Sequence, residues 1–363
     1  MTKTIKRRSF LKTAGVGLAA STIAAPAIAQ SMPELKWRMT TSWPKSLDTL
    51  YGGAEYIAKR VGEMTDGKFQ IRAFAGGEIV PALQALDATS NNTVEMCHTA
   101  SYYYVGKDPT FAFNTAMPHG LNTRQQMAWL SHGGGSQVLQ EFYDGYNVHQ
   151  IAGGETGAQM GGWYRKEIKS VEDLKGLKMR IGGWGGQVFS RVGVVPQLIA
   201  GGDIYPSLEK GTIDAAEWVG PYDDEKLGFY KVAKYYYYPG WWEGCAMLSV
   251  FINKGAWEKL PKGYQAVVEA ACAEGHLWML AKYDAENPAA MRRLVAGGAV
   301  LKPFPKSVME ATYKAAYDLY DETAKKNAKF KKVYDQWKHF RDEERLWFRV
   351  AEETFDNFVF PRK

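Results

Sequence analysis

Apolar and polar residues alternate in two short stretches near the start of the chain, at residues 35–40 and 69–74. Such alternation is typical of a strand with one buried face. Between these two stretches, apolar residues recur at spacings of three and four over residues 46–65. A second helical pattern follows the stretch at 69–74 and includes residues 82–86. This β-α-β-α order predicts a parallel sheet with helices on its faces.

Similar patterns return in the middle of the chain, where residues 177–181 indicate a strand and residues 187–192 a helix. Another helix and strand are indicated within residues 207–216. The sequence therefore predicts an α/β fold with two lobes, because the chain is long enough for two cores. We expect the first lobe to comprise residues 30–150 with part of 250–305, and the second lobe residues 151–250.

From Pro305 the pattern changes to long helices, with apolar residues three or four positions apart between Met309 and Phe340. One interpretation is that these helices pack on their own lobe, because apolar stripes on helices are usually buried within the chain. The other is that residues 305–363 include an extended helix that makes a dimer contact. Both interpretations stay open at this point.

The first 29 residues have the order of an export signal. Arg7 and Arg8 precede an apolar run from Ala14 to Ala27, and an Ala-Ile-Ala stop ends at Ala29. The run is shorter than the roughly 20 residues that a membrane-spanning helix needs. Paired arginines before Ser-Phe-Leu-Lys are typical of the twin-arginine export route. We expect a cleaved signal peptide and a periplasmic mature protein; an uncleaved membrane anchor is the alternative.

The basic character of the whole chain comes mostly from this leader. The formal net charge is +6, and the leader holds five basic and no acidic residues, so the mature chain carries +1. A nucleic-acid partner is therefore disfavoured. Cys97, Cys245 and Cys272 have neither zinc-ligand spacing nor the even number of a disulfide framework, although one disulfide remains possible.

Signals for enzyme chemistry are weak. The sequence has no nucleophile elbow, no HExxH pair and no phosphate-binding loop in the mature chain, and its six histidines are scattered. We therefore do not expect an enzyme. A twin-arginine-exported periplasmic enzyme of unidentified chemistry is the alternative function.

Arg180 is the first candidate binding residue, because it ends the predicted strand at 177–181 and is followed by Gly182 and Gly183. Ligands of open α/β sheets gather at the carboxyl ends of strands. A guanidinium there can hold a carboxylate with parallel N–H donors. The alternative is an arginine that reaches solvent or pairs with a surface carboxylate.

Glu217 and Glu243 have aromatic and glycine neighbours, where a buried charge is costly without a cation. Arg180 could serve one of these carboxylates, and a hard metal ion bound by carboxylate, amide and backbone oxygens could serve both. Gln159 could supply the amide oxygen. The alternatives are ordinary surface carboxylates and a glutamine that only bonds its own loop.

Three motifs resemble a known family: Leu-Lys-Gly-Leu-Lys-Met-Arg at 174–180, the segment 204–218 that ends in Asp-Ala-Ala-Glu-Trp, and Phe-Ile-Asn-Lys-Gly-Ala-Trp at 251–257. They are similar to the DctP family, the periplasmic solute-binding proteins of TRAP transporters. The resemblance implies two α/β lobes joined by a long helix, which close over an organic acid. It also implies a partner, the membrane subunits that import the acid.

Within this family, the arginine that matches Arg180 pairs with the substrate carboxylate. Trp218 stands where many members have asparagine, which resembles the subgroup that binds 2-oxo acids such as pyruvate, or lactate, with a metal ion. The resemblance implies that Gln159, Glu217, the Trp218 main chain and Glu243 hold this ion and that the ion bridges to the substrate.

The same resemblance implies that Trp43, Tyr102 and Tyr103 line the pocket together with Gln159, and leaves open which tyrosine of residues 102–104 contacts the ligand. It also implies a homodimer with an exchanged C-terminal helix. Arg180, two carboxylates and a substrate carboxylate carry −2 in total. Sodium would reduce this to −1 and calcium to 0. Neutrality favours calcium, but calcium usually takes about six to eight oxygen ligands, so Na⁺ is the expected ion and Ca²⁺ the alternative.

Overall fold

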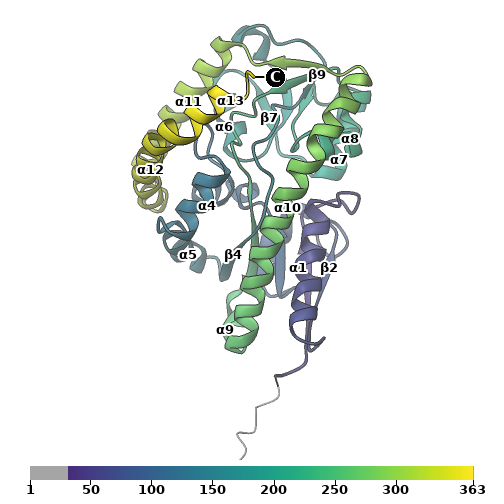
Figure 1. Ribbon diagram of the computed structural model, residues 1–363, viewed down its shortest axis with the longest axis vertical. Coiled ribbons are helices and arrows are strands. Elements are labelled where there is room, and N and C mark those ends of the chain that lie inside the picture. The colour runs from purple at the N-terminus through teal and green to yellow at the C-terminus, as the bar shows by residue number, and fades with distance from the viewer. Residues whose placement is uncertain (1–31, 363) are drawn as a thin grey trace, which may run out of the picture. The chain divides into compact units, whose positions relative to one another are not determined.

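The structure is a computed structural model that describes residues 32–362, and the predicted signal peptide lies outside these residues. The described part of the chain forms two sheets with helices packed around them (Figure 1). We call the five-stranded sheet with its helices the first lobe and the six-stranded sheet with its helices the second lobe. This is the two-lobed α/β architecture that the sequence predicts.

The first sheet has the strand order β2-β1-β3-β10-β4. The predicted parallel pairing is confirmed for β1 with β2 and β3, but β10 runs antiparallel to both β3 and β4. The sheet is therefore mixed, because β10 returns from the second lobe and enters from the opposite end. Its strands are β1 (Leu35–Thr41), β2 (Phe69–Phe74), β3 (Met96–Thr99), β4 (Val148–Glu155) and β10 (Met247–Asn253).

The second sheet has the order β11-β9-β5-β8-β6-β7 and is also mixed, since β5 runs antiparallel to its two neighbours. The strand within the Asp-Ala-Ala motif is only two residues long, which is shorter than the pattern predicts. The strands are β5 (Trp163–Tyr164), β6 (Lys178–Arg180), β7 (Val195–Gln197), β8 (Ala215–Ala216), β9 (Tyr235–Tyr238) and β11 (Val300–Pro303).

Helix α10 (Lys262–Ala296) is the long helix that the family resemblance implies, and it is 35 residues long. Pro261 precedes its first turn, where a missing N–H costs nothing, and Gly297 ends it. Figure 1 shows it running past α1 of the first lobe toward α8 of the second, and it contacts both. One element therefore lies against both lobes.

The remaining helices cover the sheet faces or cap strand ends. In α1 the buried positions, including Leu50, Ile57 and Val61, form the predicted helical stripe. These helices are α1 (Leu50–Met64), α2 (Ala85–Ser90), α3 (Ala112–Thr115), α4 (Thr123–Ser131), α5 (Gly135–Asp144), α6 (Gly183–Arg191), α7 (Gly201–Glu209), α8 (Pro221–Leu227) and α9 (Lys254–Lys259).

The C-terminal helices are α11 (Lys306–Lys326), α12 (Ala328–Phe348) and α13 (Thr354–Val359). The predicted stripe up to Trp337 is buried within this chain, where Phe330 packs on Phe113 of the first lobe and on Trp184 of the second. Beyond it, apolar side chains from Leu346 onward are exposed. The packed interpretation is therefore correct for the first part of this region only.

No helix within the described residues is long and apolar enough to cross a membrane. The three cysteines are buried and unpaired. The chain passes between the two sheets after β4, before β10 and again between β10 and β11. The division into domains at residues 150, 250 and 305 stays a prediction.

Candidate functional site

A small cavity lies where the two lobes meet. Strand ends and loops of both lobes contribute to its wall, and five of the predicted site residues belong to it. The others on the wall are mostly apolar. The lining residues are Trp43, Leu50, Ala100, Tyr102, Tyr103, Thr156, Gln159, Trp218, Val219, Ala246 and Leu248.

Arg180 lies at the carboxyl end of β6, as predicted, but it does not reach solvent, since only 1% of its surface is exposed. Its Nε donates to the Ile199 carbonyl at 3.1 Å, and Nη1 donates to the Glu217 carbonyl at 2.8 Å. Nη1 also pairs with the Glu217 carboxylate. The guanidinium lies over the Trp218 ring, 4.9 Å from its centroid. Arg180 is therefore held in one orientation beside the cavity wall.

Glu217 follows β8 and is fully buried with Arg180. Its Oε1 accepts from the Gly182 N–H at 2.8 Å as well as from Arg180. Its Oε2 has no hydrogen-bond partner within residues 32–362. Gly162 lies close behind, with φ +84°, and a Cβ there would come within 2.7 Å of the Ala216 carbonyl. Glycine is required at this close approach.

Gln159, Trp218 and Glu243 bring three oxygen atoms together. The Gln159 amide nitrogen donates to Thr156 Oγ1 at 3.0 Å, so its oxygen faces Glu243 Oε2 at 2.7 Å and the Trp218 carbonyl at 2.8 Å. Two arrangements resolve this contact between acceptors. The amide can be reversed and donate to both oxygens, or the three oxygens can share a cation.

The carboxylates of this site are costly to keep charged. Burial raises the pKa of Glu243 well above its usual range, and the Glu217 charge raises it further, against the Tyr102 hydroxyl and the Arg180 charge. Burial also raises the pKa of Glu217, against Arg180 and the Gly182 N–H. Glu243 Oε1 has no hydrogen-bond partner in the described part of the chain. One more positive charge beside Glu217 and Glu243 would therefore stabilise the ionised forms of these carboxylates.

Three aromatic residues of the cavity wall come from the first lobe, and Trp218 adds a fourth from the second. Trp43 is fixed by its indole N–H, which donates to His98 Nδ1 at 2.6 Å. Tyr102 and Tyr103 line the cavity, whereas the Tyr104 hydroxyl lies in the first lobe, where it accepts from the Leu86 N–H at 3.1 Å. Of the three tyrosines, only Tyr102 and Tyr103 therefore belong to the cavity wall.

The two lobes touch directly around the cavity. The rings of Trp43 and Trp218 lie edge to face with centroids 6.4 Å apart. Tyr102 packs on Gly183, where a Cβ would lie 2.2 Å from the tyrosine ring. The φ of Gly183 is +57°, so a side chain at this position would be strained as well as blocked. We call this arrangement, in which the two lobes touch around the cavity, the closed arrangement.

Two residues that the sequence analysis missed organise the crossings between the lobes. Thr156 holds the Gln159 amide, and Glu155, which is fully buried, accepts at Oε1 from the N–H groups of Thr156, Gly157 and Ala246 at 2.8–3.1 Å. Glu155 thus ties the crossing after β4 to the crossing before β10. A carboxylate at the end of a buried strand was the available signal, but its partner is 91 residues away.

Within residues 32–362, no three His, Cys, Asp or Glu side chains lie close enough together to hold a metal ion. A metal site at the cavity would therefore need amide and backbone oxygens beside its carboxylates. Gln159 and the Trp218 carbonyl are such groups, and they face Glu243. This donor set, with oxygens only, suits sodium or calcium rather than zinc or copper.

Comparison with known proteins agrees with this architecture. Residues 39–327 match the family described as bacterial extracellular solute-binding protein, family 7, or DctP. The chain belongs to this family. A monocarboxylate 2-oxoacid-binding periplasmic protein of Nostoc sp. is 53% identical to it, over 98% of this chain and 99% of the relative.

Two solved structures extend the comparison. A TRAP transporter solute-binding protein from Bordetella bronchiseptica has a TM-score of 0.90 and 59% identity, over 91% of this chain and 98% of that chain. It crystallised as a mixed-occupancy dimer with copurified calcium and picolinate in one active site and an apo site in the other. A TRAP periplasmic solute-binding protein from Pseudoalteromonas atlantica, with bound sodium and pyruvate, has a TM-score of 0.86 and 36% identity over 89% of this chain and 98% of that chain.

Family membership decides between the two predicted functions in favour of solute binding, and the prediction that the chain is not an enzyme is confirmed. It also places this solute-binding protein outside the cytoplasmic membrane. The twin-arginine signal stays a prediction, because it lies outside the described residues. The roles of the individual site residues are likewise a matter for proposal.

Proposed function

We propose that this family 7 protein captures a small 2-oxo or 2-hydroxy monocarboxylate in the periplasm, of the pyruvate or lactate kind, and delivers it to the membrane subunits of a TRAP transporter. The observation that carries the proposal is the convergence of buried acceptor oxygens beside a buried arginine at a small cavity. A relative with 53% identity is named for monocarboxylate 2-oxoacids, and one with 36% identity holds pyruvate.

A cation bridges protein and substrate in this proposal. Gln159, Glu217, Glu243 and the Trp218 carbonyl would hold it, since Oε2 of Glu217 and Oε1 of Glu243 lack partners within residues 32–362 and the Gln159 amide lies against Glu243 Oε2 and the Trp218 carbonyl. The ion would supply positive charge to the substrate carboxylate and the 2-oxygen. The relatives contain sodium in one case and calcium in another. Calcium would make the assembly neutral, whereas sodium would leave one negative charge.

Arg180 would bind the substrate carboxylate through Nη2. Its Nε and Nη1 already donate within the protein, and a guanidinium has two more N–H groups on Nη2. Tyr103 lies near the same guanidinium. Burial raises the pKa of Tyr103 to about 12, although the Arg180 charge acts in the opposite direction. Tyr102, Tyr103 and Trp43 would close the pocket over the substrate. The apolar wall of Leu50, Val219 and Leu248 would face its alkyl end.

Titration calorimetry with pyruvate tests this function. We expect binding in calcium or sodium and at least tenfold weaker binding in low-sodium buffer with EDTA. By linkage, pyruvate must strengthen ion binding by the same factor. Equal pyruvate affinity in all three buffers would contradict the bridging ion. Failure of pyruvate, lactate and longer 2-oxo acids to bind in any buffer would contradict the substrate class.

We also propose that the C-terminal segment from Leu346 forms a homodimer contact by packing on a second copy of the chain. Its large apolar side chains are exposed in the single chain, for example Trp347 at 59% and Phe360 at 78%. Such a patch on a soluble protein usually marks an interaction surface. The relative with 59% identity crystallised as a dimer.

The oligomeric state in solution tests this contact. Trp347→Asp should convert a dimer to a monomer in light scattering after gel filtration, because a buried charge at an apolar contact is costly. Lys338→Asp is the control, as it changes charge on the same helix without touching the exposed apolar segment. A monomeric wild-type protein at micromolar concentration, or a dimeric Trp347→Asp variant, would contradict the proposal.

A further inference from the structure

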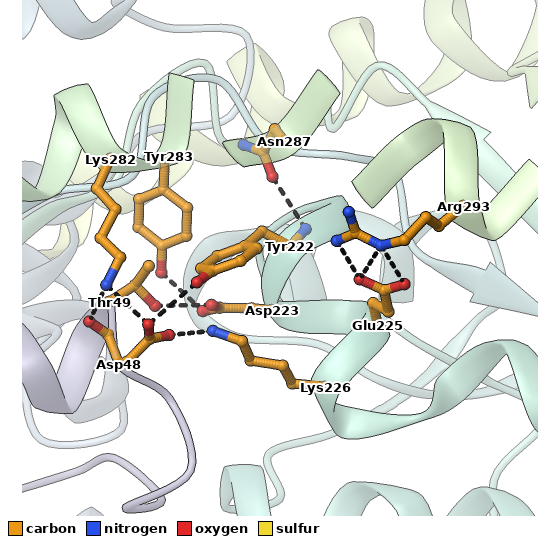
Figure 2. A network of polar contacts seen from close by, with 10 residues as sticks. All are labelled: Asp48, Thr49, Tyr222, Asp223, Glu225, Lys226, Lys282, Tyr283, Asn287 and Arg293. Carbon is orange, nitrogen blue, oxygen red and sulfur yellow. Dashed lines mark hydrogen bonds and ion pairs between the residues drawn. The ribbon is translucent and has the colours of Figure 1, made fainter. Parts of the chain in front are cut away.

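Outside the cavity, a polar network joins the first lobe to α8 of the second lobe, and the proposed ligand contacts none of it. Figure 2 shows its side chains, which come from the loop before α1, from α8 and from α10. Two first-lobe residues, Asp48 and Thr49, make the contacts across the lobes. We call Asp48, Thr49, Tyr222, Asp223 and Lys226 the cross-lobe network.

Thr49 stands at the N-cap of α1, where a threonine hydroxyl ordinarily accepts from the first turn of its own helix. Here it caps nothing. Its Oγ1 instead donates to Asp223 Oδ1 at 2.6 Å, and the Tyr283 hydroxyl of α10 donates to Asp223 Oδ2 at 2.7 Å (Figure 2). Thr49 and Asp223 are both fully buried. Separation of the lobes would remove one of the two side-chain donors to this carboxylate.

Asp48 adds the charged half of the network. It pairs with Lys226 of α8, accepts from the Tyr222 hydroxyl at 3.0 Å, and accepts from Lys282 of α10 at 2.8 Å. Burial raises its pKa, but the two lysines outweigh burial and hold the pKa at about 2. Because half of the Asp48 side chain is exposed, each of these ion pairs is worth little by itself. Together they fix α8 against the first lobe.

Helix α8 is in turn fixed to the binding site. Pro221, its first residue, follows Trp218 after two residues, and Asp224 Oδ1 accepts from the Val219 N–H at 3.3 Å. Asp224 Oδ2 accepts from Trp163 Nε1 and from the Tyr236 hydroxyl, at 2.9 and 2.7 Å. A movement of α8 would therefore also move the backbone of Trp218 and Val219 at the cavity wall.

We propose that Asp48 and Thr49 are positioning residues for ligand binding, which hold α8 and the Trp218 segment against the first lobe in the closed arrangement. The proposal rests on the proposed function above for its ligand. The cross-lobe contacts add to the stability of the closed arrangement, so they raise affinity by increasing the fraction of molecules able to retain ligand. They touch neither substrate nor cation, and we expect their effect mainly on the dissociation rate.

Glu225 provides a matched control. It lies on the same helix, and its carboxylate accepts from Arg293 of α10 at 2.6–3.1 Å (Figure 2). This ion pair joins α8 to α10 without a first-lobe residue. Glu225→Gln therefore removes a carboxylate from an ion pair of α8 while leaving the cross-lobe network in place.

The test compares pyruvate affinity in calcium for the wild type, Asp48→Asn, Thr49→Val and Glu225→Gln. We expect about three- to tenfold weaker binding for Asp48→Asn, about tenfold for Thr49→Val, and less than twofold for Glu225→Gln. Stopped-flow tryptophan fluorescence should show faster dissociation in the first two variants. Wild-type affinity should fall with added salt more steeply than that of Asp48→Asn, because salt screens the lysine pairs.

Ligand-free melting temperatures within about 2 °C of the wild type show that a weaker variant is folded. Affinities for Asp48→Asn and Thr49→Val within twofold of Glu225→Gln would overturn the proposal. A wild type that does not bind pyruvate contradicts the proposed function instead, and small-angle scattering of the ligand-free proteins then decides. Asp48→Asn more expanded than Glu225→Gln supports the network, and identical profiles overturn it.

Discussion

Replacement of Glu243 by glutamine should affect stability and binding in opposite directions. The carboxylate is 1% exposed, and its Oε1 has no partner within residues 32–362. Since burial raises its pKa well above the usual range, the native state favours the protonated acid. Stability is therefore lost as the pH rises above the ordinary pKa of a glutamate, and Glu243→Gln removes this loss at neutral pH.

The magnitudes follow from the contacts. Relief of an unpaired buried polar group is worth about 1–3 kcal/mol, so the ligand-free variant should be more stable by about that amount. In the proposed ion site, the same change removes one of two carboxylates and leaves an amide. Coupling energies between bound groups are typically about 1–3 kcal/mol, which corresponds to roughly 5- to 150-fold weaker pyruvate binding in calcium.

Two measurements check this prediction. Chemical denaturation in EDTA gives the free energy of unfolding of each ligand-free protein, and calorimetry gives pyruvate affinity with and without calcium. We expect Glu243→Gln to be stabilised in the first and to lose its calcium dependence in the second. A variant that is less stable than the wild type in EDTA, or that retains calcium-dependent binding within twofold, would refute the reasoning.

Two further variants have distinct expected outcomes. Arg180→Lys should weaken pyruvate binding by about 2–4 kcal/mol in calorimetry, because an ammonium cannot keep the Ile199 and Glu217 contacts and still reach the substrate; a loss below about 0.5 kcal/mol would mean that Arg180 is not the anchor. Burial raises the pKa of Glu155 to about 7, so the wild type loses stability between pH 4.5 and 7. In chemical denaturation, Glu155→Gln should therefore unfold like the wild type at pH 4.5 and be more stable by about 1–3 kcal/mol at pH 8, and equal stability of the two proteins at pH 8 would contradict this.

Several strands of the fold could be predicted from local sequence patterns. Residues 35–40, 69–74 and 177–181 alternate or cluster as strands do, and the structure has strands there. The direction of β10 was not accessible in this way, because pairing direction depends on where the chain re-enters the sheet. The length of β8 was overestimated for a similar reason. Its pairing ends at Ala216, after which Glu217 turns to Arg180.

For the candidate site too, the sequence indicated which residues take part but not how they are arranged. Arg180, Glu217 and Glu243 stand out in the sequence because charged residues rarely occur among aromatic and glycine neighbours, and all three are buried. Their arrangement was predicted only through the family resemblance. Asp48 and Thr49 gave no signal, because an Asp-Thr pair before a helix is an ordinary cap. Only the structure shows that Thr49 caps nothing and that its partner is 174 residues away.

The site residues come from different parts of the fold. The affinity for the ion and the affinity for the carboxylate should therefore depend differently on the contact between the lobes. Gln159 and Glu243 lie on the crossings after β4 and before β10, and the Gln159 amide contacts Glu243 Oε2 and the Trp218 carbonyl of the second lobe. The proposed ion therefore needs no side chain from the first lobe. Trp43, Tyr102 and Tyr103, which would cover the substrate, do come from the first lobe. Loosening of the lobes should therefore weaken retention of the carboxylate more than binding of the ion.

Asp48→Asn can test this separation. Calcium binding to the ligand-free variant, measured by calorimetry, should match the wild type within twofold, while its pyruvate affinity in saturating calcium falls three- to tenfold. Equal losses for both would mean that the ion site itself needs the closed arrangement. Closure would then precede ion binding, and the first lobe would contribute to the ion site as well as to the pocket.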